Sequence, residues 1–302
     1  MLTLFTIPKP FSGAAAIAQD NAIESWQRVA PDVEILLFGD EAGIAEAAVR
    51  HGVGHVAQIR RNEHGTPLLD DAFATAQARA RHARVGYVNA DIVFLPSLAR
   101  ALERLTLPRY LMVGRRTDLD VPERLDFADG GWAATLEARA RREGTLHEPT
   151  GIDYFIFPRG QVASMPAFPV GRALWDNWMI YHARAEHIPV VDATPEVLVV
   201  HQNHDYGHVQ GGRRTTEVGA EVQKNWQMLG PDFMQLTIVD ATWRLGPDGA
   251  HPARDLGGMF RRLAVGAALR PPLRPSVRVA RAVYRALNNV AARGSARAGR
   301  PS

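Results

Sequence analysis

The stretch YVNADIVF, residues 87–94, places Asn89 and Asp91 at the end of an apolar run. A carboxylate in that position is one way in which α/β proteins hold a metal ion or a polar ligand. Asn and Asp are equally common where a strand turns, because their side chains hydrogen-bond the local backbone. On its own, the stretch predicts a ligand site or a turn in equal measure.

A second acid, Asp176, lies between two aromatic residues in the stretch GRALWDNWMIYHAR. Aromatic ring faces cover the apolar side of a sugar ring, and a carboxylate accepts a hydroxyl proton. We therefore expect Asp176 to act as a general base and Trp175 and Trp178 to contact an acceptor. The alternative is that Asp176 only caps the helix that follows, which is worth about 1 kcal/mol.

The stretch HQNHDYGH gathers His201, His204 and His208 with Asp205 directly after the apolar VLVV. Tracts this rich in His often bind metal ions. His201 is the first candidate ligand, and His204 is the second. Asp153, at the start of the strand-like GIDYFIFPRG, is expected to contact an acceptor or to form a structural turn.

Apolar strands alternate with amphipathic helices through the first hundred residues. This pattern predicts an α/β fold with a mostly parallel sheet and helices on both faces. The strands are expected over 2–8, 32–40, 55–59 and 85–95, and the helices over 14–30, 41–52 (with Gly52 as its C-cap) and 66–82.

In such sheets, ligands bind beyond the carboxyl ends of the strands. No G-x-G-x-x-G follows the first strand and no G-x-x-x-x-G-K-[ST] occurs, so a dinucleotide site and a P-loop are poorly supported. A divalent cation that bridges phosphates is the usual substitute. The residues at these strand ends are Thr6, Pro8 and Lys9, then Gly39, Asp40 and Glu41, then Arg61 and Asn62. Arg115 and Arg116 are further candidates for a diphosphate, although exposed arginines are common.

The order of YVNADIVF, GIDYFIFPRG, GRALWDNWMIYHAR and HQNHDYGH resembles that of a bacterial GT-A-fold glycosyltransferase, one of the nucleotide-diphospho-sugar transferases, over residues 1–245. The resemblance implies transfer of a sugar from a nucleotide-diphosphate donor, with a UDP-sugar favoured, to a hydroxyl of a saccharide or lipid-linked acceptor. It points to cell-surface polysaccharide or glycolipid synthesis. Inversion and retention at the anomeric carbon both stay open.

Carried over residue by residue, the resemblance puts Asn89 and Asp91 in the family's Asp-x-Asp motif. Asp91, His201 and His204 would then hold Mn²⁺ or Mg²⁺, and Asp176 would face the acceptor. Asn89 departs from the motif because it is neutral, and it can instead hydrogen-bond a ribose or sugar hydroxyl. The donor-binding residues implied are Thr6, Pro8, Lys9, Asp40, Arg61 and Asn89.

Two other functions fit the same residues. A metal-dependent hydrolase would use His201, His204 and Asp205 with Asp91. A non-catalytic module that binds sugar nucleotides is possible because a fold does not fix a function.

Charge divides the chain unevenly. The 302 residues have a net charge of +3 and are 46% hydrophobic. Residues 253–302 contain eleven Arg and one acid, Asp255, a balance of +10, which leaves residues 1–252 at −7. An acidic body argues against nucleic-acid binding. We expect a catalytic domain over 1–252, with a nucleotide-sugar half (1–105) and an acceptor half (106–252), and a basic helical tail over 253–302.

Apolar residues recur at helical spacing in the tail, opposite arginines. Such a helix either packs on the acidic body or binds an anionic membrane surface, where lipid-linked acceptors lie. The chain has no Cys, no long apolar run and no secretory signal pattern. The expected location is cytoplasmic, with peripheral attachment at the inner face of the membrane as the sharper hypothesis. The apolar positions are Ala280, Val283, Tyr284, Leu287 and Val290.

Overall fold

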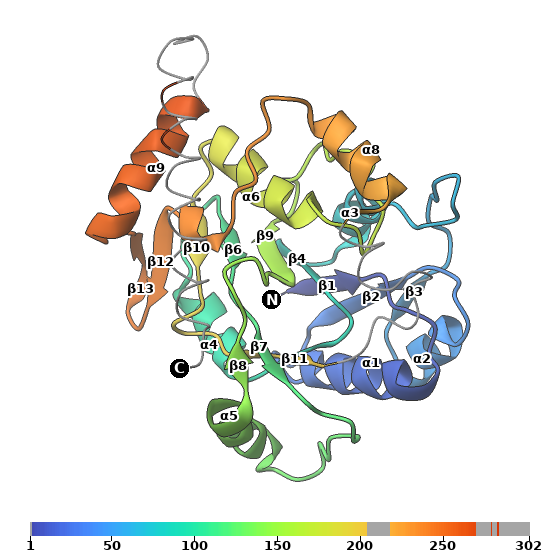
Figure 1. The fold of residues 1–302 in the computed structure, drawn as a ribbon. Coiled ribbons are helices and arrows are strands. Elements are labelled where there is room, and N and C mark those ends of the chain that lie inside the picture. The colour runs from blue at the N-terminus through green and yellow to red at the C-terminus, as the bar shows by residue number, and fades with distance from the viewer. Residues whose placement is uncertain (1, 204–217, 270–278, 280–282, 284–302) are drawn as a thin grey trace, which may run out of the picture.

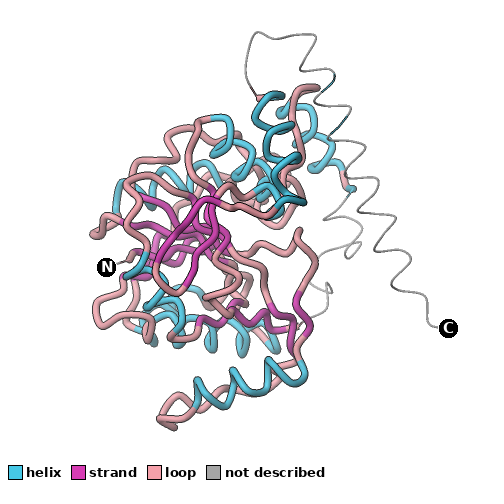
Figure 2. The backbone as a smooth tube through the Cα atoms, turned by 90° about the vertical axis from the view of Figure 1, so that its left-hand side faces the viewer, coloured by secondary structure: helices cyan, strands magenta, loops and turns pink. Residues whose placement is uncertain are grey.

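The computed structural model describes residues 2–203, 218–269, 279 and 283 of the chain (Figure 1). Within them, strands form a nine-stranded sheet and a four-stranded sheet. In Figure 2 the strands of the large sheet lie between helices on either side. No described helix is long and apolar enough to span a membrane.

The first half of the chain alternates strands and helices as its sequence pattern predicts. Gly52 ends the second helix with a left-handed φ of 64°, which confirms it as the C-cap. The elements are β1 (Thr3–Thr6), α1 (Gly13–Trp26), β2 (Glu34–Phe38), α2 (Ile44–His51), β3 (Gly54–Val56), α3 (Leu69–Arg79), β4 (Arg84–Val88), β5 (Ile92–Phe94) and α4 (Ser97–Arg104).

The second half contributes further strands to both sheets. Its elements are β6 (Leu111–Val113), β7 (Thr117–Leu119), α5 (Trp132–Glu143), β8 (Thr145–Leu146), β9 (Tyr154–Pro158), α6 (Trp175–Ala185), β10 (Val190–Asp192), β11 (Val199–Gln202), α8 (Ala220–Leu229), the 3₁₀ turn η1 (Ile238–Asp240), β12 (Trp243–Gly246), β13 (Gly249–Pro252) and α9 (Leu256–Ala268).

The large sheet has the order β13-β12-β10-β6-β9-β4-β1-β2-β3. β4, β1, β2 and β3 run parallel, as do β6, β10 and β12. β9 runs antiparallel to its neighbours β4 and β6, and β13 runs antiparallel to β12. The mostly parallel α/β sheet predicted from the sequence is therefore confirmed.

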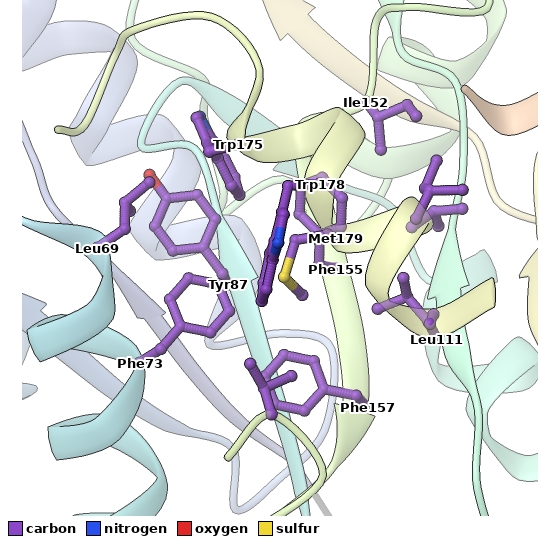
Figure 3. Close-up of a cluster of buried hydrophobic side chains, with 14 of the residues drawn as sticks. Leu69, Phe73, Tyr87, Leu111, Ile152, Phe155, Phe157, Trp175, Trp178 and Met179 are labelled. Atoms are coloured by element: carbon purple, nitrogen blue, oxygen red, sulfur yellow. The ribbon is translucent and has the colours of Figure 1, made fainter. Parts of the chain in front are cut away.

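Alternate strand residues face two separate hydrophobic cores, as a period of two requires. Phe5 packs in the core that includes residues of α3 and α6, whereas Leu4 packs in the core that includes residues of α1, α2 and α4. Figure 3 shows the first core, where the rings of Phe73, Tyr87 and Trp175 meet. The ring centroids of Tyr87 and Trp175 lie 5.0 Å apart. Burial on both faces explains why these strands are continuously apolar.

One predicted strand, 85–95, is wrong in its extent. β4 ends at Val88, and β5 belongs to the four-stranded sheet β5-β11-β7-β8. The backbone turns between them, where the Ile92 N–H donates to the Asn89 carbonyl at 3.1 Å. The uniform hydrophobicity of the run hides this break, because β5 is buried as completely as β4, but in another sheet.

The first part of the basic tail, α9, packs on the body. Val265 and Ala268 belong to the first core. The Arg261 guanidinium pairs with both oxygens of the fully buried Asp240, at 2.6 and 2.9 Å. Met259, Phe260 and Leu263 are exposed on this helix. The apolar positions predicted for a helix over 280–290 lie outside the described residues, except for Val283.

Candidate active site

The turn between β4 and β5 carries Asn89 and Asp91 to the carboxyl edge of the parallel strands. The Asn89 N–H donates to the Asp153 carbonyl at 2.9 Å, which extends the pairing of β4 with β9. The Asn89 side-chain amide donates to Asp153 Oδ1 at 2.6 Å. Asn89 and Asp153, predicted separately from the sequence, therefore form one hydrogen-bonded pair.

Both the backbone and the side chain of Asp91 contact other segments of the chain. Its carbonyl accepts hydrogen bonds from the Gln202 backbone N–H and side-chain amide, each at 3.2 Å. Its carboxylate faces Lys9, whose ammonium lies 3.9 Å from Oδ2. The buried Gln19 of α1 hydrogen-bonds both the N–H and the carbonyl of Lys9 and so holds the loop after β1 in place.

His201 lies inside β11, opposite Ile92 of β5 and beside Asp118 of β7. Its Nε2 is 4.0 Å from Asp91 Oδ2, and its Nδ1 is 3.1 Å from Asp118 Oδ1. The four-stranded sheet thus brings His201 to the same edge as Asp91, although 110 residues separate them in sequence.

Asp118 and Arg116 are the residues that sequence analysis did not assign to the centre of the site. Arg116 donates to Asp118 Oδ1 at 2.9 Å and to Asp153 Oδ2 at 2.7 Å, and so joins the two carboxylates. His147, after β8, contacts the other oxygen of Asp118 at 2.5 Å. The run VGRRTDLD gave no sign of this role, because the contacts depend on how β7 is placed beside β11 and β8.

The electrostatics of the cluster follow from these contacts. Burial alone would raise the pKa of Asp118, but hydrogen bonds with His201 and His147 and the Arg116 charge outweigh it and hold the pKa well below its usual range. Burial opposes the charged form of His201, yet the Asp118 contact and the Asp91 and Asp153 charges raise the pKa of its imidazole. A stably ionised Asp118 therefore faces a His that favours its charged form.

Asp176 lies in the first turn of α6 and does not occupy the N-cap position, which Leu174 occupies. It is half-buried, and burial, with the charge of Asp153 adding, raises the pKa of its carboxyl to about 6. An acid in this range is half-ionised close to neutral pH, which suits a general base. Asp176 therefore does not fill the N-cap position weighed from the sequence, although hydrogen bonds from backbone N–H groups at the helix start partly offset the rise in its pKa.

Trp175 and Trp178 are buried, at 6% and 7% exposure. The Trp175 ring packs against Tyr87 and Phe155, and the Trp178 ring packs against Phe168 and stacks on His182. Their spacing on α6 places both on the side of the helix that covers the sheet (Figure 3). This burial does not support the acceptor contact predicted for them, since core side chains cover their faces.

The remaining predicted donor residues follow β1, β2 and β3. Thr6 and Pro8 are buried at the end of β1. Asp40 and Arg61 pair with each other at 2.5 Å, and Glu41 pairs with Arg61 at 2.8 Å. Asp40 and Arg61 line an open groove of about 550 Å³ together with Val56, Ala57, Gln58, Ile59, Arg60, Asp71, Thr75 and Arg79.

The donor set at Asp91 fits a divalent cation that takes few ligands from the protein. Asp91 and His201 face each other, and oxygen-preferring cations commonly take one or two protein ligands and fill their shell with phosphate oxygens and water. Among the described residues, no three His, Asp or Glu side chains converge as a complete metal site. His204, Asp205 and His208 lie outside the described residues.

Comparison with known proteins gives structural neighbours only. No family model matches the sequence, and no curated protein matches it. A mannosyltransferase from Pyrobaculum calidifontis, solved with GDP-Man and Mn²⁺, aligns with a TM-score of 0.39 at 18% identity, over 66% of this chain and 56% of that one. The aligned part thus spans little more than half of that enzyme.

Glucosyl-3-phosphoglycerate synthase from Mycobacterium tuberculosis, solved with Mg²⁺ and UDP, aligns with a TM-score of 0.39 at 14% identity, over 68% of this chain and 72% of that one. The same enzyme with Mn²⁺, UDP-glucose and glycerol 3-phosphate aligns with a TM-score of 0.37 at 14% identity, over 68% and 73%. These neighbours are glycosyltransferases that use nucleotide sugars, the class that the sequence motifs resemble. At such identities and TM-scores the similarity fixes neither the reaction nor the substrate of this chain.

Proposed function

We propose that this chain is a GT-A-type glycosyltransferase that moves a sugar from a nucleotide-diphosphate donor, with a UDP-sugar favoured, to an acceptor hydroxyl. One observation carries the proposal: Asp91, His201 and Lys9 meet at the carboxyl edge of the sheet, beside the pair Asn89–Asp153. The cluster combines ligands for a cation with a fixed positive charge, which a diphosphate requires.

On the donor side, Asp91 and His201 would hold Mn²⁺ or Mg²⁺. When bound, the cation neutralises the charge that builds on the leaving diphosphate. The Lys9 ammonium, 3.9 Å from Asp91, is placed to add a second positive charge. Asp40 and Arg61 at the groove are the proposed contacts for the nucleoside, whereas the burial of Thr6 and Pro8 does not support the donor contact predicted for them.

On the acceptor side, Asp176 is the proposed base. It takes the proton of the acceptor hydroxyl as that oxygen bonds to the anomeric carbon, and the bond from this carbon to the diphosphate breaks with its electron pair leaving on the diphosphate. Asp153 lies close enough to raise the pKa of Asp176 through its charge, while Asn89 and Arg116 keep it hydrogen-bonded. We propose that Asp153 orients the acceptor.

A metal-dependent hydrolase is not favoured. A catalytic zinc site takes three protein ligands and leaves one position for water. The described residues supply only Asp91 and His201 to such a site, and the other ligands proposed for it, His204 and Asp205, lie outside them. A binding module would need no base, whereas the half-buried Asp176 has a pKa in the range of one.

The test is a panel of UDP, GDP, dTDP and CMP with the full-length protein, each with and without Mn²⁺. We expect one nucleoside diphosphate to raise the melting temperature more with Mn²⁺ than without it, and its sugar conjugate to be turned over. Stabilisation by the metal alone would indicate the hydrolase. Nucleotide binding with no turnover on any sugar conjugate would indicate the binding module.

We also propose that the acceptor is a saccharide or lipid-linked molecule of cell-surface polysaccharide or glycolipid synthesis, and that the tail brings the protein to an anionic membrane. Support comes from α9, where Phe260 and Leu263 are 67% and 64% exposed while Arg261 and Val265 contact the body. Because α9 is part of the core, a deletion should begin after residue 269. Residues 270–302 hold eight of the eleven arginines of residues 253–302 and no acid. We expect the shortened protein to keep its fold and, because these charges are lost, to sediment less with anionic vesicles at low salt. Equal sedimentation of both proteins would contradict the membrane role.

A further inference from the structure

We propose that Asp118 is a positioning residue for His201, so that the Nε2 lone pair of this imidazole is presented toward Asp91 and the cation. The inference rests on the proposed function, since it explains how one of the proposed metal ligands is oriented. Asp118 belongs to no motif that marked the site in the sequence.

Strand register brings the two side chains together. β11 and β7 run parallel, and His201 and Asp118 are paired residues in that ladder. Side chains of paired residues project from the same face of a sheet and lie within contact distance. The separation of 3.1 Å between His201 Nδ1 and Asp118 Oδ1 is therefore a property of the fold and does not depend on a flexible rotamer alone.

The two ring nitrogens of His201 face different partners. Nδ1 faces Asp118, and Nε2 faces Asp91 Oδ2 at 4.0 Å. An ionised carboxylate only accepts hydrogen bonds, so the 3.1 Å approach of Asp118 favours the hydrogen on Nδ1, although this contact is not a well-aligned hydrogen bond in this structure. In the neutral ring the lone pair then lies on Nε2, on the side of Asp91. Metal-binding imidazoles are commonly fixed in this way by a carboxylate on the other nitrogen.

Contacts to both oxygens fix the orientation of the Asp118 carboxylate. Arg116 donates to Oδ1 at 2.9 Å, and His147 contacts Oδ2 at 2.5 Å. The His147 ring is in turn packed against Gly151, where a Cβ atom would lie only 2.7 Å from the ring Cγ. A carboxylate fixed by two neighbours, Arg116 and His147, is suited to fix a third group, the imidazole of His201.

The first test reads the tautomer of His201 in the metal-free, full-length protein by NMR of the imidazole nitrogens at alkaline pH, where the ring is neutral. The resonance is assigned by its absence in a His201→Gln variant. We expect hydrogen on Nδ1 in the wild type and a shift toward the Nε2–H form in Asp118→Ala, with Asp118→Asn in between because its amide oxygen still accepts. A wild-type His201 with hydrogen on Nε2 would overturn the proposal.

The second test titrates Mn²⁺ in the presence of UDP and follows the electron paramagnetic resonance of free Mn²⁺. We expect the Mn²⁺ dissociation constant to rise about 10–100-fold in Asp118→Ala. The matched control is Asp20→Asn, because Asp20 is also a largely buried carboxylate in contact with a His (His51 Nε2, 2.7 Å) and with Arg50, but on α1. This control should lose stability and keep its Mn²⁺ affinity.

The outcomes separate the inference from the proposed function. If the wild type binds Mn²⁺–UDP and Asp118→Ala binds it equally well, the positioning role of Asp118 is rejected and the proposed transferase function is unaffected. If the wild type does not bind Mn²⁺–UDP, but the His201 tautomer differs between the wild type and Asp118→Ala, the proposed metal-binding function is rejected and the positioning of His201 by Asp118 is supported.

Discussion

The substitution Asp176→Asn should raise stability and remove activity at the same time. Burial raises the pKa of this carboxyl from 3.8 to about 6. A shift of roughly two pKa units corresponds to about 3 kcal/mol, because each unit is worth about 1.4 kcal/mol. The folded protein therefore carries a cost of this order whenever Asp176 is ionised, and the neutral amide of Asn does not.

The sign of the pH dependence follows from the raised pKa. A group whose pKa is higher in the folded state favours folding while it is protonated, and this contribution is lost as the pH rises through about 6. At neutral pH the Asn variant should thus unfold at a higher urea concentration than the wild type. Its free energy of unfolding should be greater by up to about 3 kcal/mol. The difference should shrink toward zero as the pH falls to about 4.

Turnover should move in the opposite direction. Loss of a general base costs about a hundred- to ten-thousand-fold in rate, while donor binding stays nearly unchanged. Wild-type turnover should fall as the pH drops below about 6, since the base must be ionised. Urea unfolding and donor turnover, each measured across this pH range, check the prediction. An Asn variant that keeps wild-type turnover would refute the role of base, which would then be sought at Asp153 or Asp205.

Three further substitutions test other parts of the molecule. Asp91→Ala should abolish turnover and the Mn²⁺-dependent gain in nucleotide binding. The melting temperature should change little, because the carboxylate is partly exposed and its ion-pair partner Lys9 lies 3.9 Å away. Turnover near the wild-type rate would contradict the role of Asp91. Arg261→Ala should lower the free energy of unfolding by about 3 kcal/mol or more, since it leaves the fully buried Asp240 without its guanidinium, whereas the exposed Arg254→Ala should change it little. Gly114→Ala should destabilise the fold, because the new Cβ would overlap the Tyr154 hydroxyl and lie 3.0 Å from Cζ of that ring. The double variant Gly114→Ala/Tyr154→Phe should recover part of the lost stability. If the two substitutions change the free energy of unfolding in urea in a strictly additive way, this contact is disproved.

The sequence predicts the first four strands of the parallel sheet and the helices between them because their patterns are local. A buried strand such as β2, with four of its five residues buried, reads as an apolar run between turn residues, and an amphipathic helix such as α2 shows its own period and its Gly52 cap. The division of 85–95 into β4 and β5 cannot be read in this way. β5 exists because β11, more than a hundred residues later, pairs with it.

The same distinction separates the site residues that the sequence predicts from those it misses. Asp91 and His201 are visible because each adjoins an apolar strand in a polar motif. Asp118 is not, and Arg116 is predicted only as a candidate for a diphosphate, since the role of both comes from the register of β7 against β11 and from the loop that precedes β9. The acceptor contact predicted for Trp175 is hard to judge from the sequence for a related reason. Aromatic residues beside an acid fit a sugar site and a helix face equally well, and only the structure shows that Trp175 packs against Tyr87 and Phe155.

The Asn at position 89, the departure from an Asp-x-Asp motif, has a physical reason in this fold. Its amide donates to Asp153 Oδ1 at 2.6 Å, which a carboxylate cannot do without a proton. An Asp at this position would face Asp153 at hydrogen-bond distance, and two carboxylates that close share a proton or repel each other. Arg116 already divides its positive charge between Asp153 and Asp118, so it has little left to neutralise a third acid. A neutral residue at 89 therefore keeps Asp153 hydrogen-bonded in place, and it leaves Asp91 as the carboxylate of the turn that is proposed to hold a cation.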